Sequence, residues 1–136
     1  MIPEIYISLV IEEDAVDDKL LALLKEMGAT ESWFKGQPKG KTILTHESNG
    51  CKFSAESQPT TDFYTERVIS DFWNHIKLNK KELVEIIQKN DLAPIFSVIV
   101  YVVDTVPSIH LENTLLKELA QVNIGIDIDV IIRKKQ

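Results

Sequence analysis

The first regular segment of the chain is Glu4–Asp14, which reads EIYISLVIEED. It is rich in β-branched and aromatic residues, which pack well on a pleated surface, and it predicts a buried β-strand that ends in acidic residues. A helix is expected next, because leucines recur at spacings of three and four within residues 17–27. Gly28 follows this run in the position of a helix-ending glycine.

The Asn49-Gly50 pair is the clearest local signal in the middle of the chain. It lies within residues 42–57, TILTHESNGCKFSAES, between two stretches that suit β-strands. Because Asn-Gly tolerates the positive φ angles of a type I′ turn, the segment predicts a β-hairpin with a two-residue loop. That register would place His46 opposite Phe53 on the packed face of the hairpin and would leave the other face in water.

The remaining elements follow from hydrophobic periodicity and from turn residues. We expect, in chain order, a short strand over Ser32–Lys35, helices over Thr61–Lys77 and from Asn79 to about Asn90, a strand over Ile95–Asp104, a helix from Pro107-Ser108 to Asn123, and a strand from Gly125 to about Arg133. The second of these helices opens with a capping-box pattern, because Glu82 follows Asn79 at the required spacing.

These elements predict an α+β fold, in which a single, largely antiparallel sheet carries helices on one face. The segment Asp18–Gly28, DKLLALLKEMG, is also similar to Asn113–Asn123, NTLLKELAQVN, and each follows a β-branched strand that ends in an acidic residue. Two explanations stay open. The chain contains a two-fold repeat of strand–helix–strand units, or the similarity is only the amphipathic pattern that such helices share.

Length and composition favour one domain over residues 1–136. Cys51 is the only cysteine, so no disulfide can form within the chain. Acidic residues interrupt the N-terminal apolar run, and no stretch approaches the roughly 18–20 apolar residues of a membrane span, so we expect a cytoplasmic protein without a signal peptide or membrane association. The net charge of −6 argues against binding to nucleic acid and is compatible with a basic protein partner.

The last predicted strand contains a pair of aspartates, in the sequence Gly125–Val130, GIDIDV. Side chains alternate along a strand, so Asp127 and Asp129 point to the same side, about 6.6 Å apart along the chain. Carboxylates at that distance could flank a metal ion, but the sequence offers neither a third ligand nor a glycine-rich phosphate loop beside them. The pair therefore indicates the solvent side of a strand, or a surface that binds a protein.

Other side chains able to do chemistry lack the neighbours that such chemistry requires. No pair among His46, His75 and His110 has the spacing of a zinc motif, and Cys51 has no adjacent base in the sequence. The common motifs of nucleotide binding, serine hydrolysis and zinc proteolysis are missing as well. We therefore predict no catalytic residue, no metal site and no cofactor, and we predict that the protein is not an enzyme.

Acidic residues also cluster between the first strand and the first helix. They either stay solvated and complement the positive end of the helix dipole, or they dock a basic partner. Trp33 lies beside loop glycines and is an aromatic residue of the kind that anchors interfaces. The predicted partner-binding residues are Glu12, Glu13, Asp14, Asp17, Asp18, Trp33, Asp127 and Asp129. Whether they form one surface is not decided by the sequence.

The order of these segments resembles a bacterial family catalogued as a domain of unknown function, number forty-two seventy-nine. The resemblance spans Ile5 to Val130 and implies a small α+β domain without an established activity. Members are similar in size and acidity to bacterial immunity proteins, which neutralise a toxin domain by binding its active site or an adjacent exosite. The carrying segments are the Lys35-Gly36 loop, the end of the hairpin near Phe53–Ser57 (FSAES), the strand Phe96–Asp104 (FSVIVYVVD) and the ending Gly125–Val130.

Different functional classes therefore remain open. The first is an immunity-type binding protein, whose acidic surface occludes a cognate basic toxin, for example a nuclease. The alternative is a small-molecule-binding or regulatory module without catalytic activity, with a cleft around Trp33, His46 and Trp73. A third is an enzyme that uses Asp127 and Asp129 with a divalent metal. The sequence does not fix the oligomeric state.

Overall fold

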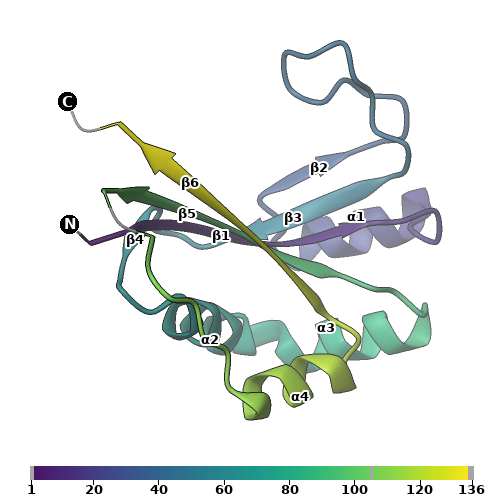
Figure 1. The fold of residues 1–136 in the computed structure, drawn as a ribbon. Coiled ribbons are helices and arrows are strands. Elements are labelled where there is room, and N and C mark those ends of the chain that lie inside the picture. The colour runs from purple at the N-terminus through teal and green to yellow at the C-terminus, as the bar shows by residue number, and fades with distance from the viewer. Residues whose placement is uncertain (1, 105, 135–136) are drawn as a thin grey trace.

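A computed structural model describes residues 2–104 and 106–134, and at positions 77–79 it describes the backbone alone. The elements confirm the predicted α+β class (Figure 1). The strands are β1 Glu4–Glu12, β2 Glu31–Trp33, β3 Gly50–Ser54, β4 Thr60–Thr61, β5 Ile95–Val103 and β6 Gly125–Arg133. The helices are α1 Asp18–Glu26, α2 Thr65–His75, α3 Lys77–Lys89 and α4 Asn113–Gln121.

The strands form one open sheet in the order β2-β3-β1-β5-β6, and β4 pairs with the start of β1. Strand β1 lies at the centre, antiparallel to both β3 and β5, so that Leu9 faces Phe53 on one side and Phe96 on the other. Strands β5 and β6 are parallel, and α4 connects them. The sheet is therefore largely antiparallel, as predicted, with one parallel pair at its edge.

The helices cover one face of this sheet (Figure 1). Along β1 the burial alternates, and Ile5, Ile7, Leu9 and Ile11 are at most 2% exposed beneath the helices. Each fully buried side chain of this size stabilises the fold by about 1.5–3 kcal/mol. The opposite face of the sheet, which we call the open face, carries none of the helices formed by the described residues (Figure 1).

Helix α1 begins and ends where the sequence predicts. Asp17 caps it, because a carboxylate oxygen accepts a hydrogen bond from the amide of Leu20 at 2.7 Å. Asp18 adds a negative charge in the first turn, beside the positive end of the helix dipole. Gly28 follows with a φ of +108°, a conformation that favours glycine at a helix end.

The predicted hairpin at Asn49-Gly50 is wrong. Strand β3 begins at Gly50 itself and pairs with β1 and β2, while residues 35–49 form a loop with one isolated bridge, Pro38 to Thr45. The tertiary surroundings override the local turn preference. A Cβ atom at Gly50 would lie 2.7 Å from Nε1 of Trp33, so glycine serves here for close packing rather than for a turn.

Asn49, the other residue of the Asn-Gly pair, makes long-range hydrogen bonds through its side chain. Its side-chain oxygen accepts a hydrogen bond from the amide of Lys35 at 2.8 Å. Its side-chain nitrogen donates to the carbonyl of Val16 and to the carboxylate of Asp18, each at 3.0 Å. Asn49 therefore fastens the loop of residues 35–49 to the start of α1, which is a long-range role that a dipeptide motif does not reveal.

Smaller differences concern where helices begin. Helix α4 begins at Asn113 rather than at Pro107-Ser108, and α3 begins at Lys77 rather than at Asn79. The capping box proposed at position 79 depends on a side chain outside the described residues. The two-fold repeat stays a prediction. The two units differ in one respect: α4 joins the neighbouring strands β5 and β6, whereas α1 joins β1 and β2, which have β3 between them.

Replacing Gly50 by alanine should lower the free energy of unfolding by about 1–3 kcal/mol, the usual range for overpacking. The new Cβ would meet Trp33 and also the Ile11 carbonyl oxygen, at 2.8 Å. The matched control is Gly125→Ala, where the nearest atom, on Ile95, is 3.9 Å away. Urea unfolding of both variants measures the difference. Equal stabilities would contradict the packing role of Gly50.

Candidate functional site

The open face carries a row of small polar side chains across the sheet. The strand register places Ser8 of β1 opposite Ser54 of β3 and Ser97 of β5, and Ser97 in turn lies beside Asp127 of β6. Neighbouring strands are about 4.8 Å apart, so these side chains are close enough to contact one ligand. The row is half-buried at its serines and exposed at Asp127.

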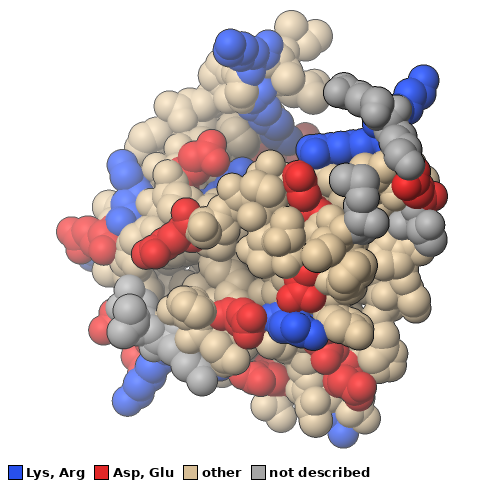
Figure 2. Space-filling view, turned by 90° about the vertical axis from the view of Figure 1, so that its left-hand side faces the viewer, with Lys and Arg blue, Asp and Glu red and all other residues tan. Residues whose placement is uncertain are grey.

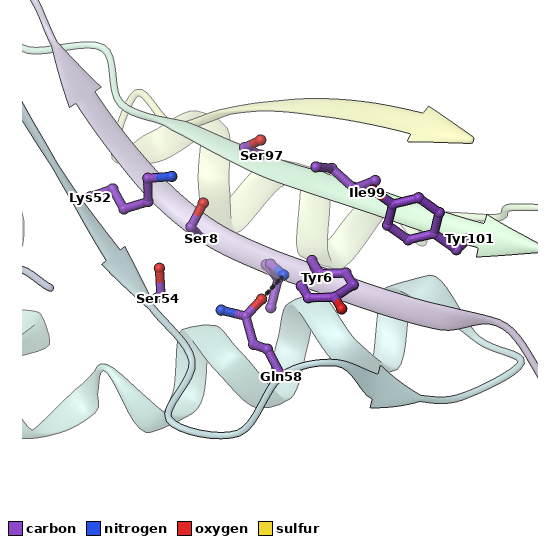
Figure 3. Close-up of a pocket in the computed structure, with 9 residues that line it drawn as sticks. Tyr6, Ser8, Lys52, Ser54, Gln58, Ser97, Ile99 and Tyr101 are labelled. Atoms are coloured by element: carbon purple, nitrogen blue, oxygen red, sulfur yellow. Dashed lines mark hydrogen bonds between the residues drawn. The ribbon is translucent and has the colours of Figure 1, made fainter. Parts of the chain in front are cut away.

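A hollow of about 240 Å³ lies over this row, and Figure 3 shows the side chains around it. We call it the serine hollow. Among the described residues, no hydrogen bond is made by the hydroxyls of Ser8, Ser54 or Ser97, so they are available to a ligand. The full lining is Tyr6, Ile7, Ser8, Lys52, Ser54, Gln58, Ser97, Ile99 and Tyr101.

Gln58 forms one side of the serine hollow and also completes the hydrogen bonding of β1. Its side-chain oxygen accepts a hydrogen bond from the amide of Ile7 at 2.8 Å, between the part of β1 that pairs with β3 and the part that pairs with β4 (Figure 3). Lys52, at another side of the hollow, lies 3.3 Å from the carboxylate of Glu31. The hollow therefore contains a neutral amide and a partly neutralised cation.

Aromatic and charged groups close the hollow toward the end of β6. The rings of Tyr6 and Tyr101 meet edge to face at 5.6 Å. Arg133 lies over the Tyr101 ring at 3.8 Å and contacts the Glu4 carboxylate at 3.2 Å. Figure 2 shows this end of the molecule, where acidic and basic side chains are interspersed. This end is therefore not a continuous acidic patch.

The acidic turn, residues 12–18, lies at the other end of β1. Glu12 contacts Nδ1 of His46 at 2.9 Å, and Asp14 accepts a hydrogen bond from the hydroxyl of Ser48. Together with the bonds of Asp17 and Asp18 at the start of α1, these contacts hold the neighbouring loop and helix. Each of these predicted partner-binding residues thus has an internal structural contact.

Glu13 links the acidic turn to the segment that precedes β5. Its carboxylate accepts a hydrogen bond from the amide of Ala93 at 2.7 Å, and the adjacent Pro94 accepts one from the amide of Gly125 at 2.9 Å. The acidic turn and the start of β6 therefore lie at the same end of the sheet, linked through residues 93 and 94. This adjacency depends on contacts between residues far apart in the sequence.

Asp127 and Asp129 lie on the open face and are exposed. Their neighbours Ile126 and Ile128 pack against the core from the other side of β6. Within residues 2–104 and 106–134, neither aspartate makes a hydrogen bond or an ion pair. No group of three or more His, Cys, Asp or Glu side chains suited to a metal ion occurs in this described part of the chain.

Trp33 is half-buried rather than freely exposed. His46 stacks on its ring at 4.5 Å with an interplanar angle of 15°, and its indole nitrogen is buried without a hydrogen-bond partner among the described residues. The cleft predicted around Trp33, His46 and Trp73 is wrong, because Trp73 lies in the core on the helix side of the sheet, at 1% exposure. The prediction that His46 faces Phe53 fails with the hairpin.

Cys51 is fully buried, on the face of β3 that meets the helices. Burial raises the pKa of its thiol from 9.0 to about 12, because the thiolate would lose its hydration. A thiol in this environment is a poor nucleophile at neutral pH.

The serine hollow is the site that sequence reasoning missed. A signal for it was present, since Ser8 and Ser97 each stand among apolar and aromatic residues of their strands. The sequence could not reveal that the strand register brings them together beside Ser54. Nor could it reveal that Gln58 would reach the backbone of β1.

The fold and the site define a small α+β protein, in which helices cover one face of an open sheet and the other face carries a polar hollow. The chain belongs to the family described as a domain of unknown function (DUF4279), which matches residues 3–133 and confirms the expected family. Neither the search of curated proteins nor that of solved structures returned a significant match. No helix in the described ranges is long and apolar enough to cross a membrane.

Burial of Cys51 should protect it from thiol reagents at pH 8 in the folded protein, with full labelling in guanidinium chloride. Above pH 9.0 the unfolded chain loses this proton while the folded chain keeps it. The stability tied to this group is therefore present below pH 9.0 and is lost as pH rises toward 12. Cys51→Ala should reduce that alkaline loss. Labelling faster than global unfolding would contradict the burial.

Proposed function

We propose that this protein is an immunity-type binding protein, which neutralises a cognate basic toxin domain by covering its functional surface. The observation that carries the proposal is the exposed pair Asp127 and Asp129, whose carboxylates have no ion-pair partner among the described residues. They lie on the open face, away from the four helices of the described chain (Figure 1). The net charge of −6 adds a long-range attraction for a basic partner.

The acidic turn contributes to the same attraction from the neighbouring end of the sheet. Its carboxylates have internal contacts, but Asp14, Asp17 and Asp18 stay exposed, so their charges act on an approaching protein. Charged groups at an interface chiefly increase the association rate and the specificity of binding. In this proposal the aspartates of β6 provide most of the steering and contact the toxin directly, and the acidic turn adds to the steering.

A basic toxin such as a nuclease fits this surface because its own substrate is an anion. Neutralisation needs only occlusion of the toxin site by the open face, and it uses no chemistry of the bound protein. The half-buried serines supply hydrogen-bonding groups beside the carboxylates. These hydroxyls would add hydrogen bonds to the charge complementarity of the interface.

The test is charge reversal. The partner is first captured from the lysate of the native host by the tagged protein, and association is then followed by stopped flow at about 50 mM and about 300 mM salt. Asp127→Lys with Asp129→Lys should slow association at low salt by about tenfold or more and should remove most of its salt dependence.

The matched control is Glu82→Lys with Glu85→Lys, which makes the same change in net charge on the exposed side of α3. It should leave association close to that of the unmodified protein. Equal rates for the two double variants would mean that net charge alone matters, and unchanged rates in both would refute the electrostatic proposal.

A second candidate function is supported by the serine hollow. Its volume of about 240 Å³ suits a ligand smaller than a typical drug, and its hydroxyls and amide suit a polar one. In this alternative the protein is a small-molecule-binding or regulatory module without catalytic activity. The ligand would contact Ser8, Ser54 and Ser97 from the open face.

A metabolite panel tests this alternative by thermal shift. A ligand at about 100 times its dissociation constant adds about 2.7 kcal/mol, so the Tm should rise by about 10 °C. Ser97→Val removes a hydroxyl from the hollow and should abolish the shift, whereas Ser108→Val, at an exposed position outside the hollow, should keep it. No shift with any compound would argue against a ligand in the hollow.

A further inference from the structure

Strand β6 leaves one long edge of the sheet unpaired. It is nine residues long, pairs with β5 on one side, and has no strand on its other side among the described residues. Natural proteins usually shorten, cover or charge such edges, because their free backbone groups can pair with another chain. A long free edge is therefore a candidate interface.

The backbone groups at this edge can be assigned. The amide of Gly125 donates to Pro94, and the alternation of strand geometry then directs the odd-numbered residues of β6 toward β5. The even-numbered residues Ile126, Ile128, Val130 and Ile132 direct their N–H and C=O groups outward. These four positions offer an uninterrupted set of donors and acceptors to an added strand.

The second half of β6 is also apolar on both faces. Val130 is 37% exposed, Ile131 is 41% exposed and Ile132 is 63% exposed. Its first half differs, since Ile126 and Ile128 pack against the core. Exposed β-branched residues next to unpaired backbone groups favour addition of a strand along this half of β6.

The charges of β6 identify the strand that fits. Asp127 and Asp129 lie near its start, and Arg133 lies at its end. In an antiparallel pair of two β6 strands centred on Val130, Asp127 of each copy faces Arg133 of the other, on the same face of the sheet. Ile128 then faces Ile132. A parallel pair in register would instead place aspartate beside aspartate, which is destabilising.

We propose that a second copy of this chain pairs with the first along β6, in an antiparallel arrangement with its two-fold axis at Val130. The outward backbone groups of the even-numbered residues then form a ladder between the copies. The two sheets become continuous, and both open faces look to the same side. Such isologous pairing is the usual form of a homodimer. The inference does not depend on the proposed toxin partner.

Arg133 points inward over the sheet in the single chain and would turn outward on pairing. Its guanidinium lies over the Tyr101 ring and contacts Glu4, while the side chain remains 46% exposed. Tyr101 and Glu4 lie on β5 and β1, inward of β6, so the guanidinium must leave these contacts when it turns toward a carboxylate of the partner across the free edge.

The test is sedimentation velocity of the full chain from about 1 µM to about 1 mM, because a dimer responds to concentration. Val130→Pro removes an outward N–H while leaving the ladder to β5 intact, a position at which edge strands tolerate proline. It should weaken dimerisation by about tenfold or more. Val130→Thr keeps the N–H and the β-branched shape and should dimerise like the unmodified protein.

Charge exchange tests the register. Asp127→Arg or Arg133→Asp alone should weaken the dimer by about tenfold, and the two together should restore it. Circular dichroism of each variant checks that the fold is kept. A protein that stays monomeric over the whole range would overturn the proposal, as would a dimer that is indifferent to Val130→Pro. These measurements contain no partner protein, so their failure leaves the proposed function untouched.

Discussion

The pairing of β1 on both sides is the constraint on which the rest of the structure depends. Its inward residues, from Ile5 to Ile11, form the floor of the core, and its edges hydrogen-bond to β3, β4 and β5. A shift of one residue in register would move every one of these side chains into water. The same register places Ser8 between Ser54 and Ser97. The pairing of β1 with β3 and β5 therefore determines both the packing of the core and the arrangement of side chains on the open face.

Much of the fold could be predicted because its longest elements carry strong periodic signals. Strands β1, β5 and β6 and helix α1 fall within one or two residues of where hydrophobic pattern and caps place them. The loop of residues 35–49 could not be predicted. Asn49-Gly50 has a strong turn preference, but the packing of Trp33 on Gly50 and the three hydrogen bonds of Asn49 are worth more than that preference.

The candidate site was less predictable than the fold. Charge alone singled out the acidic residues, yet it could not reveal that Glu13 would bind the amide of Ala93 or that His46 would contact Glu12. Such contacts join residues that are far apart in the sequence. The serine hollow requires the register of neighbouring strands, which no single segment contains. Local patterns predict elements, whereas sites depend on how elements meet.

Gln58 hydrogen-bonds to the backbone of β1 and also lines the serine hollow, so a ligand in the hollow can act on β1 through it. Its oxygen replaces a strand partner for Ile7, while its nitrogen has only a long contact, 3.5 Å, to the Ala55 carbonyl. A bound molecule that accepts a hydrogen bond from that nitrogen would orient the amide and strengthen its bond to β1. A ligand in the hollow would then slow hydrogen exchange of the Ile7 amide in β1.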